Sequence, residues 1–263
     1  MDMELNSSTW KNIDLNVDSL WIMGPRAKGG KRENNYHGNF APQIPNEMIQ
    51  HYTQKGDVVL DMFMGSGTTL FECETLQRNY IGFDINDEII QYVQNKMTNC
   101  NTIQFKIENC DITYGEQVAQ RVNKDLQEMN ADKVSLILSH PPYLDIVKFT
   151  DKPEDLSQIS DVSHFIEIYI QSVRNVWEYL KPKGTFVLVI GDAYKNSEVV
   201  PLGFYLMNAI QKCFKCQLKG IVVKDIVNNR GKIGTEAIHR YRALKFGYYI
   251  FKHEYIFVFK KLK

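Results

Sequence analysis

A glycine-rich turn is the first feature of the chain that could do chemistry. It contains Gly65 and Gly67 and follows residues 57–61 (DVVLD), which are predicted to form a buried strand. Ligands of open α/β sheets bind beyond the carboxyl ends of the strands, and a glycine lets the backbone approach a ligand closely because it has no Cβ. A lone Gly-x-Gly is weak evidence of a ligand site, so its meaning depends on the residues that follow.

Two acidic residues lie at or just after the ends of the next two predicted strands. Asp84 ends residues 79–84 and suits the two hydroxyls of a ribose, and Asp111 follows residues 102–107 and suits the edge of an adenine. The third glycine of a dinucleotide fingerprint is missing, and so is the Gly-Lys-Ser/Thr of a P-loop. The glycine turn and the two acids therefore predict a site for a nucleoside cofactor without phosphates.

A second turn, residues 140–143 (HPPY), follows the predicted strand 134–138. Prolines fix φ and carry no backbone donor, so the Pro141 carbonyl and the His140 side chain stay available as hydrogen-bond acceptors. On its own this sequence is better explained as a tight turn with a packed tyrosine. Because the glycine turn is also present, the interpretation of HPPY as a functional motif is favoured.

The two turns together resemble the amino-group DNA methyltransferases, which use S-adenosylmethionine to methylate adenine N6 or cytosine N4. Residues 63–69 (FMGSGTT) are similar to the methyl-donor motif of that family, and HPPY is similar to its Asp/Asn/Ser-Pro-Pro-Tyr signature. Residues 39–45 (NFAPQIP) resemble the segment that contacts the methionine part of the donor, and residues 253–259 resemble the family's last strand. The resemblance covers most of the chain.

The resemblance implies a donor site and a catalytic turn, with S-adenosylmethionine as the cofactor and no metal. The residues implied in donor binding are Phe40, Gln43, Asp61, Phe63, Gly65, Gly67, Thr68, Asp84 and Asp111. Those implied in catalysis are His140, Pro141, Pro142 and Tyr143. An exocyclic base amine is a poor nucleophile because its lone pair is conjugated with the ring. Acceptors at position 140 and at the Pro141 carbonyl would each take one amine hydrogen and direct the lone pair toward the donor methyl.

His140 is the departure from the family pattern, which has an acid, an amide or serine at this position. A neutral imidazole nitrogen accepts a hydrogen bond and an imidazolium does not, so activity should fall below a pH of roughly 6.5. Tyr143 offers a flat face to a base rotated out of the duplex, and such stacking contributes about 1–3 kcal/mol. The histidine leaves adenine and cytosine open as targets, with adenine N6 slightly favoured.

The charge of the chain is balanced overall and uneven along it. The totals are 31 basic and 31 acidic residues, yet residues 211–263 contain 13 Lys and Arg against 3 Asp and Glu. Such a cluster is typical of a polyanion partner, here double-stranded DNA, although a solvated basic face is an equal alternative. The candidate DNA-reading insert is residues 225–251, where the candidate nucleic-acid contacts are Arg230, Lys232, Arg240 and Arg242. Its tyrosines are equally compatible with the core of a hairpin.

Two further segments are candidate loops. Residues 145–161 follow the catalytic turn and are placed to close over a flipped base. Residues 24–35 are basic and glycine-rich, which predicts a mobile surface loop, with a solvated charge run favoured over a phosphate-binding one.

Apolar runs alternate with helical patterns from residue 56 onward, which predicts βαβ units. We expect a three-layer α/β fold, Rossmann-like, with a mostly parallel sheet and an antiparallel C-terminal edge strand. Residues 1–263 are expected to form one domain in which residues 36–56 contact the donor. The predicted helices are 68–76, 87–97 with Asn86 as N-cap, 162–180 and 202–214. The later predicted strands are 185–190, 218–223 and 255–260, and residues 181–184 (KPKG) are predicted to form a turn.

Composition excludes a membrane protein, because no apolar run approaches the roughly 20 residues that a spanning helix needs. The acidic start lacks the pattern of a secretory signal, so a cytoplasmic location is expected. Five cysteines suit reduced thiols, and a structural role for Cys213 and Cys216 is favoured over metal binding.

Several alternatives to a DNA methyltransferase remain open. They are an RNA amino methyltransferase, a protein glutamine methyltransferase and a non-catalytic nucleic-acid-binding partner subunit. A cognate restriction enzyme or a partner subunit is a possible companion of the protein.

Overall fold

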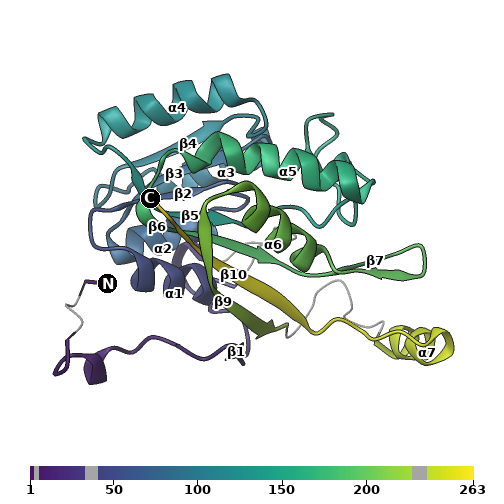
Figure 1. Cartoon of the computed structure of the whole chain (residues 1–263). Helices are drawn as coiled ribbons and strands as arrows, with labels where there is room; N and C mark the ends of the chain where they lie inside the picture. Colours follow the sequence, from purple (N-terminus) through teal and green to yellow (C-terminus); the bar gives the residue numbers. More distant parts are fainter. Residues whose placement is uncertain (3–5, 33–40, 227–235) are drawn as a thin grey trace.

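The computed structural model of the chain describes residues 1–2, 6–32, 41–226 and 236–263. Within them one sheet has eight strands in the order β1-β9-β10-β6-β5-β2-β3-β4, and helices cover both of its faces (Figure 1). Strand β10 runs antiparallel to both of its neighbours, whereas the other pairs in this sheet are parallel. The predicted α/β class with a mostly parallel sheet is confirmed.

The bounds of the strands are β1 Leu20–Trp21, β2 Val58–Asp61, β3 Asn79–Asp84, β4 Phe105–Asn109, β5 Val134–Ser139, β6 Leu180–Ile190, β7 Ala193–Lys195, β8 Glu198–Val200, β9 Cys216–Asp225 and β10 His253–Lys261. The α-helices are α1 Gln43–Tyr52, α2 Thr68–Leu76, α3 Asp87–Met97, α4 Gly115–Glu128, α5 Val162–Trp177, α6 Leu202–Cys213 and α7 Glu236–Phe246. The described residues also form three short 3-10 helices, η1 Trp10–Asn12, η2 Gly30–Arg32 and η3 Leu156–Gln158.

Two hydrophobic clusters hold the three layers together, one on each face of the sheet. On one face α1, α2 and α3 pack against the strands, and Ile49, Leu70 and Val93 are fully buried there. On the other face α4, α5 and α6 pack against the sheet. The central strands β2 and β5 are buried along their whole length, as is typical of parallel strands that are covered on both faces.

The elements around the first turn begin and end where local signals place them. Helix α3 starts after Asn86, whose side chain accepts hydrogen bonds from the backbone N–H groups of Glu88 and Ile89, which confirms the predicted N-cap. The predicted bounds of α2, β3 and α3 also agree with the structure.

Two predictions about the last strands are wrong. Strand β10 lies inside the sheet and not at its edge, because it pairs with β6 on one side and with β9 on the other, and the short strand β1 pairs in turn with β9. Residues 181–184 are not a turn between elements but part of β6. The pairing of β6 with β5 jumps from Leu180 to Thr185, and Lys183 has a positive φ of 65°, so these residues form an irregularity within the strand.

Helices α1 and α4 were not predicted from the sequence. Helix α4 buries Val118, Val122 and Leu126 at intervals of four residues, and polar side chains cover the rest of its surface. Helix α1 includes Pro45 within its first turn, where a missing N–H costs no hydrogen bond. No helix in the part of the chain that the structure describes is both long enough and apolar enough to cross a membrane.

An acid buried on α4 makes the stability of the fold depend on pH. Asp125 is 1% exposed, its Oδ2 atom has no hydrogen-bond partner, and burial together with the charge of Glu108 raises its pKa to about 6. The raised pKa means that this residue's contribution to stability is present at low pH and is lost as pH rises through about 6.

We therefore expect Asp125→Asn to raise the melting temperature at pH 8 and to leave it nearly unchanged at pH 4. Each 1 kcal/mol gained corresponds to roughly 2–4 °C for a chain of this size. Thermal unfolding at the two pH values measures the effect, and Asp132→Asn, at an exposed position nearby, is the control. Equal shifts at both pH values would contradict the expected ionisation effect.

Candidate active site

The two turns singled out in the sequence follow neighbouring strands and begin at the same edge of the sheet. Strand β2 ends at Asp61 and β5 ends at Ser139, and the two strands are hydrogen-bonded in parallel with Asp61 opposite Leu138. The pairing continues one residue further, because the Met62 N–H donates to the Leu138 carbonyl at 3.0 Å. The glycine turn and the His140–Tyr143 turn therefore begin side by side.

The glycine turn has a backbone shape that side chains disfavour. Gly65 and Gly67 have φ values of 50° and 81°, and Gly67 is the N-cap of α2. A Cβ at Gly67 would lie 2.9 Å from Val93 Cγ1 and 3.1 Å from Phe71 Cζ. This glycine is thus required both by the turn and by the close packing of α2 against α3.

Asp84 connects the end of β3 to the glycine turn. Its Oδ2 atom accepts the Gly65 N–H at 2.8 Å, and its Oδ1 atom accepts the Asn86 N–H at 2.9 Å. Burial raises the pKa of Asp84, and the hydrogen bonds from Asn86 and Gly65 act in the opposite direction. Each carboxylate oxygen has a further lone pair, so Asp84 can accept two more donors from a ligand.

Asp61 lies deeper, beneath the glycine turn. It is 1% exposed, and its carboxylate accepts the Phe63 N–H at 3.2 Å and the Tyr80 hydroxyl at 3.5 Å. Burial raises its pKa to about 6. These internal contacts indicate that Asp61 shapes the turn from below.

The other residues predicted to bind a donor have mixed surroundings. Thr68 is buried at the first turn of α2, and its Oγ1 atom has no hydrogen-bond partner among the described residues. Asp111 uses its Oδ1 atom to accept the N–H and the hydroxyl of Thr113, at 2.8 and 2.7 Å. Gln43 is tied to the preceding segment, since it accepts the Ala27 N–H at 3.0 Å. Phe40 lies outside the described residues.

Phe63 links the glycine turn to the end of β5. Its ring stacks on Tyr169 of α5 with the centroids 6.5 Å apart, and the Tyr169 hydroxyl lies 2.9 Å from Ser139 Oγ, one residue before His140. The ring of Tyr169 is fully buried. This contact fixes the spacing between the two turns from the side of α5.

His140 and Tyr143 form a hydrogen-bonded pair within the second turn. His140 Nε2 lies 3.2 Å from the Tyr143 hydroxyl, and the two rings meet edge to face with centroids 5.8 Å apart. The Tyr143 hydroxyl in turn donates to Glu254 Oε2 of β10 at 3.1 Å, and Lys224 of β9 donates to Glu254 Oε1 at 2.9 Å. Four side chains from three separate segments thus form one continuous chain of contacts.

Burial determines the protonation of His140 and Tyr143. It lowers the pKa of His140, an effect that the charge of Glu254 opposes and that of Lys224 supports. Burial and the neighbouring Glu254 raise the pKa of Tyr143 well above its usual value. His140 is therefore neutral and Tyr143 is protonated at neutral pH, so the imidazole can accept a hydrogen bond.

Tyr143 packs closely against the end of β6. A Cβ at Gly191 would lie 3.0 Å from Tyr143 Cε2, so the absence of a side chain at this position gives the ring its place. The tyrosine is half-buried and its hydroxyl is engaged. Its stacking on a base stays a prediction.

Lys224 and Glu254 were not predicted as site residues. Each is 7% exposed, and each lies directly opposite the other on β9 and β10. The available signal was Lys224 next to the apolar residues 221–223 and Glu254 next to the apolar run 255–259, because charges in buried strands are rare unless they are paired. Their distance from Tyr143 in the sequence hides the contact.

The segment after the His140–Tyr143 turn also reaches the predicted donor side of the site. The Asn86 side chain donates to the Phe149 carbonyl at 3.4 Å, and Lys152 Nζ forms an ion pair with Asp87 at 2.8 Å. At the other end of the segment, Lys195 pairs with Asp145 at 2.7 Å. Residues 145–161 therefore cross from the end of β5 to the start of α3.

The basic residues predicted to hold DNA lie partly on α7, which projects together with the β7–β8 hairpin from one end of the molecule (Figure 1). Arg240 and Arg242 are exposed on this helix, and Arg230 and Lys232 lie outside the described residues. Tyr241 and Tyr249 are exposed as well, at 61% and 89%, so the alternative of a hairpin core is wrong for these two. Tyr248 is half-buried, with its ring centroid 4.6 Å from that of Tyr194.

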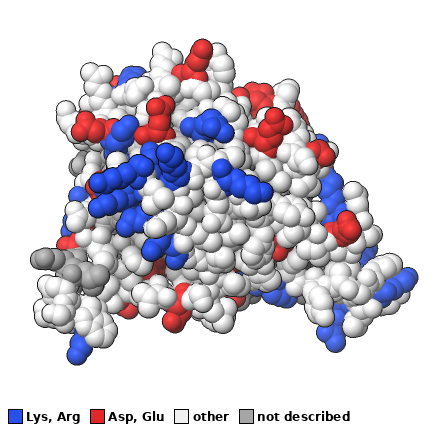
Figure 2. All heavy atoms as spheres, in the orientation of Figure 1, with Lys and Arg blue, Asp and Glu red and all other residues white. Residues whose placement is uncertain are grey.

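Other basic side chains gather elsewhere. Figure 2 shows a second group of Lys and Arg near the place where the chain ends in Figure 1, well separated from α7. The charges of residues 24–32 are not all solvated, contrary to the prediction. Lys31 pairs with Glu74 at 2.6 Å, and Arg32 donates to Glu72, which is fully buried. These two cations hold the segment against α2.

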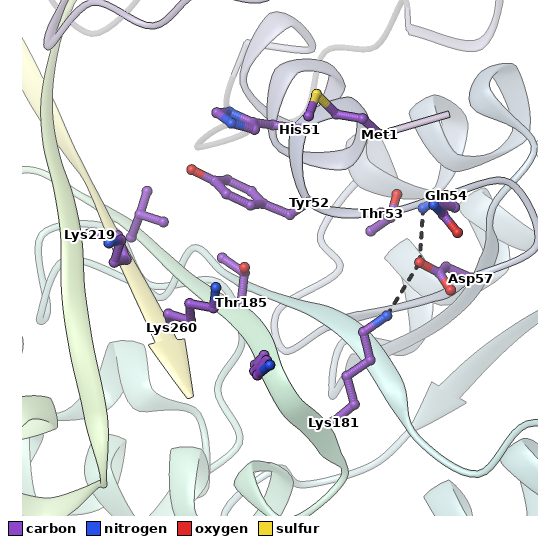
Figure 3. Close-up of a pocket in the computed structure, with 12 residues that line it drawn as sticks. Met1, His51, Tyr52, Thr53, Gln54, Asp57, Lys181, Thr185, Lys219 and Lys260 are labelled. Atoms are coloured by element: carbon purple, nitrogen blue, oxygen red, sulfur yellow. Dashed lines mark hydrogen bonds and ion pairs between the residues drawn. The ribbon is translucent and has the colours of Figure 1, made fainter. Parts of the chain in front are cut away.

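A cavity of about 590 Å³ lies at the opposite edge of the sheet (Figure 3). It opens beside Asp57, which precedes β2, and beside Lys181 and Thr185 of β6, so it faces the amino ends of the parallel strands. Neither turn contributes a lining residue. The chemistry-bearing residues and this cavity are thus separate features, and the side chains of the two turns define the candidate site.

Comparisons with known proteins match the amino-terminal part of the chain to a family model. Residues 2–95 match a family model for DNA methylases, and this range includes the glycine turn and Asp84. The chain is 33% identical over 94 residues to the type II methyltransferase M.MjaII of Methanocaldococcus jannaschii, which is 36% of this chain and 14% of that protein. It is 46% identical over 50 residues to the type II methyltransferase M.HpaI of Haemophilus parainfluenzae, which is 19% of this chain and 16% of that protein. The matches thus span less than one fifth of these relatives.

A tRNA (guanine(10)-N2)-dimethyltransferase of Methanocaldococcus jannaschii is 28% identical over 109 residues, which is 40% of this chain and 29% of that protein. Among solved structures, TrmN from Thermus thermophilus has a TM-score of 0.53 at 17% identity, over 86% of this chain and 50% of that one. At this identity the likeness shows the fold alone.

Proposed function

We infer that this chain belongs to the family of amino-group DNA methylases, because residues 2–95 match the model of that family. We propose that it transfers a methyl group from S-adenosylmethionine to an exocyclic amine of a DNA base. Adenine N6 is slightly favoured over cytosine N4. The observation that carries the proposal is the placement of the two turns. They follow the hydrogen-bonded strands β2 and β5 at one edge of the sheet, so the glycine turn, predicted to bind a nucleoside, begins next to the His140–Tyr143 turn.

The residues of the glycine turn suit the donor. The spare lone pairs of Asp84 are proposed to accept the two ribose hydroxyls. The Thr68 hydroxyl, which is buried and has no partner among the described residues, is proposed as a further polar contact. When bound, S-adenosylmethionine supplies an activated methyl group. Gly65, Gly67 and Phe63 are proposed to shape the contact surface, and Asp61 supports it from below. Phe40, Gln43 and Asp111 remain proposed contacts.

The second turn suits the acceptor amine. His140 is neutral because burial lowers its pKa, so its imidazole is proposed to accept one amine hydrogen while the Pro141 carbonyl accepts the other. Pro142 keeps the turn rigid and Tyr143 is proposed to contact the base. Hydrogen bonds to both amine hydrogens move the nitrogen toward sp³ and take its lone pair out of conjugation with the ring, and catalysis then depends on positioning and electrostatics.

Double-stranded DNA is the proposed substrate, with α7 as one phosphate-contacting element. Arg240 and Arg242 are exposed and have no acidic partner within 4.0 Å in the described parts of the chain. We expect the Arg240→Gln, Arg242→Gln double variant to weaken DNA binding and to lower the slope of log K against log salt by about 0.9 per lost phosphate contact.

Fluorescence anisotropy with a labelled duplex over a range of salt concentrations measures that slope. The matched control is the Lys212→Gln, Lys215→Gln double variant, which removes two exposed cations at the far end of α6. A slope that falls equally in both double variants would remove α7 from the DNA surface and leave only a general effect of net charge.

RNA is the second candidate substrate, because one relative is a tRNA methyltransferase. The deciding experiment uses isotope-labelled S-adenosylmethionine with duplex DNA or with total RNA, followed by digestion and mass spectrometry of the nucleosides. Label in N6-methyladenine or N4-methylcytosine of DNA supports the proposal and identifies the base. Label confined to RNA would replace the substrate, and donor binding without label in either would refute nucleic-acid methylation by this chain.

A further inference from the structure

We propose that Glu254 and Lys224 are positioning residues that hold the imidazole of His140 in a single tautomer, with its proton on Nε2. The proposal rests on the proposed function of His140 as a hydrogen-bond acceptor. It adds to that site two residues from β9 and β10, strands that lie more than 70 residues after His140 in the sequence.

The ion pair sets the direction of every hydrogen bond in the chain of contacts. Lys224 Nζ lies 2.9 Å from Glu254 Oε1, and the ammonium group can only donate. The Glu254 carboxylate can only accept, so the Tyr143 hydroxyl at 3.1 Å from Oε2 must be the donor in that contact.

The tautomer of His140 follows from this order. Because the hydroxyl hydrogen of Tyr143 points to Glu254, the Tyr143 oxygen faces His140 Nε2 with its lone pair, at 3.2 Å. Nε2 must therefore carry the hydrogen. In a neutral imidazole the other nitrogen, Nδ1, then holds the lone pair that an amine hydrogen can meet. The opposite tautomer would place two lone pairs against each other between His140 and Tyr143.

The surroundings of the ion pair keep its geometry fixed. Lys224 and Glu254 are each 7% exposed and face each other across the β9–β10 ladder, which continues in register through the next four residues of β10. The neighbouring strand β1 pairs with β9 at Trp21, which is 1% exposed and lies opposite Lys224. Buried charges of this kind are costly unless paired, and buried polar contacts often specify one arrangement of a site.

A purely structural ion pair would give a different result on mutation. Loss of either partner would then lower stability without any effect on the protons of His140. The test must therefore read the imidazole itself, and it must avoid leaving one charge buried alone, which is strongly destabilising.

The test variant is the Glu254→Gln, Lys224→Met double variant, which removes both charges together. An amide at position 254 can both donate and accept, so Tyr143 is no longer forced to point its hydrogen away from His140. Tyr143→Phe is the second variant, because it breaks the chain while leaving the ion pair intact. Glu128→Gln, which breaks the Lys106–Glu128 pair between β4 and α4, is the control.

The measurement is nitrogen NMR of the full chain with ¹⁵N-labelled histidine, in which the His140 signals are identified by their loss in His140→Gln. We expect a single Nε2–H tautomer in the unchanged protein and in the control. We expect both tautomers in the two test variants. A proton on Nδ1 in the unchanged protein would overturn the proposal, and so would a single unchanged Nε2–H tautomer in both test variants.

Kinetics provide the second readout. The kcat of the double variant should fall about 10- to 100-fold while the KM for the methyl donor stays the same, as is typical when a group that orients a functional side chain is lost. The NMR measurement needs neither donor nor DNA. A failure of the proposed methylation would therefore appear in the labelling assay, and a failure of the positioning role would appear in the spectra.

Discussion

His140→Ala is expected to lower kcat/KM for DNA methylation about 100- to 1,000-fold, the range seen when one well-placed hydrogen bond to a reacting group is lost. The side chain takes one of the two amine hydrogens in the proposed mechanism, and alanine takes none. The affinity for S-adenosylmethionine should stay the same, because His140 lies in the turn after β5 and not in the glycine turn. Labelled transfer assays and calorimetric titration of the donor measure the two quantities.

The same residue determines the expected dependence on pH. Burial lowers the pKa of His140, so the active neutral form persists below pH 6.5 and is lost only as pH falls through the lowered value. The charged groups that face it are Glu254 of β10 and Lys224 of β9. His140→Asn, which restores an amide of the family signature, should retain more activity than the alanine variant and lose this acid limb. Full activity of His140→Ala would remove the residue from the mechanism.

Asp84→Ala is expected to raise the dissociation constant for S-adenosylmethionine about 100-fold or more. Two hydrogen bonds from a ligand to a charged group contribute roughly 1.5–3 kcal/mol each, and 1.4 kcal/mol corresponds to a factor of ten. The variant also loses the acceptors of the Gly65 and Asn86 N–H groups, which loosens the glycine turn. Both effects act on the donor site and neither acts on the second turn.

The control for Asp84→Ala is Glu88→Ala, which removes an exposed carboxylate four residues later in the chain. Equilibrium donor binding without DNA measures the change, and circular dichroism establishes that both variants are folded. A folded Asp84→Ala variant that binds the donor as tightly as the unchanged protein would refute the role of Asp84. It would also refute the interpretation of the glycine turn as a donor site.

The part of the fold nearest the glycine turn could be predicted from the sequence because its signals are local. A glycine with positive φ starts α2, and the Asn86 cap starts α3, so these boundaries follow from a few adjacent residues. Helix α4 escaped prediction because its few apolar positions stand among many polar ones. The place of β10 inside the sheet depends on which strand pairs with which, and no local pattern of residues states that.

The candidate site divides in the same way. The positions of Gly67, Asp84 and His140 at strand ends follow from motifs, whereas the contact between Tyr143 and Glu254 joins residues far apart in the chain. Residues 181–184 show the converse error. Proline and glycine there are typical of a turn. The residues that flank the segment, Leu180 and Thr185, pair with neighbouring strands, so the segment stays within β6 and the irregularity is confined to a few residues.

The antiparallel insertion of β10 between β6 and β9 has a consequence for synthesis on the ribosome. Strands β2, β3 and β5, which form the proposed donor side, emerge early and pair with one another, whereas β10 emerges after every other element of the sheet. Glu254 arrives with β10. A nascent chain therefore assembles the surface proposed to hold the donor before it acquires the residue proposed to orient His140. If both proposals hold, competence for methyl transfer is the last property that this fold gains.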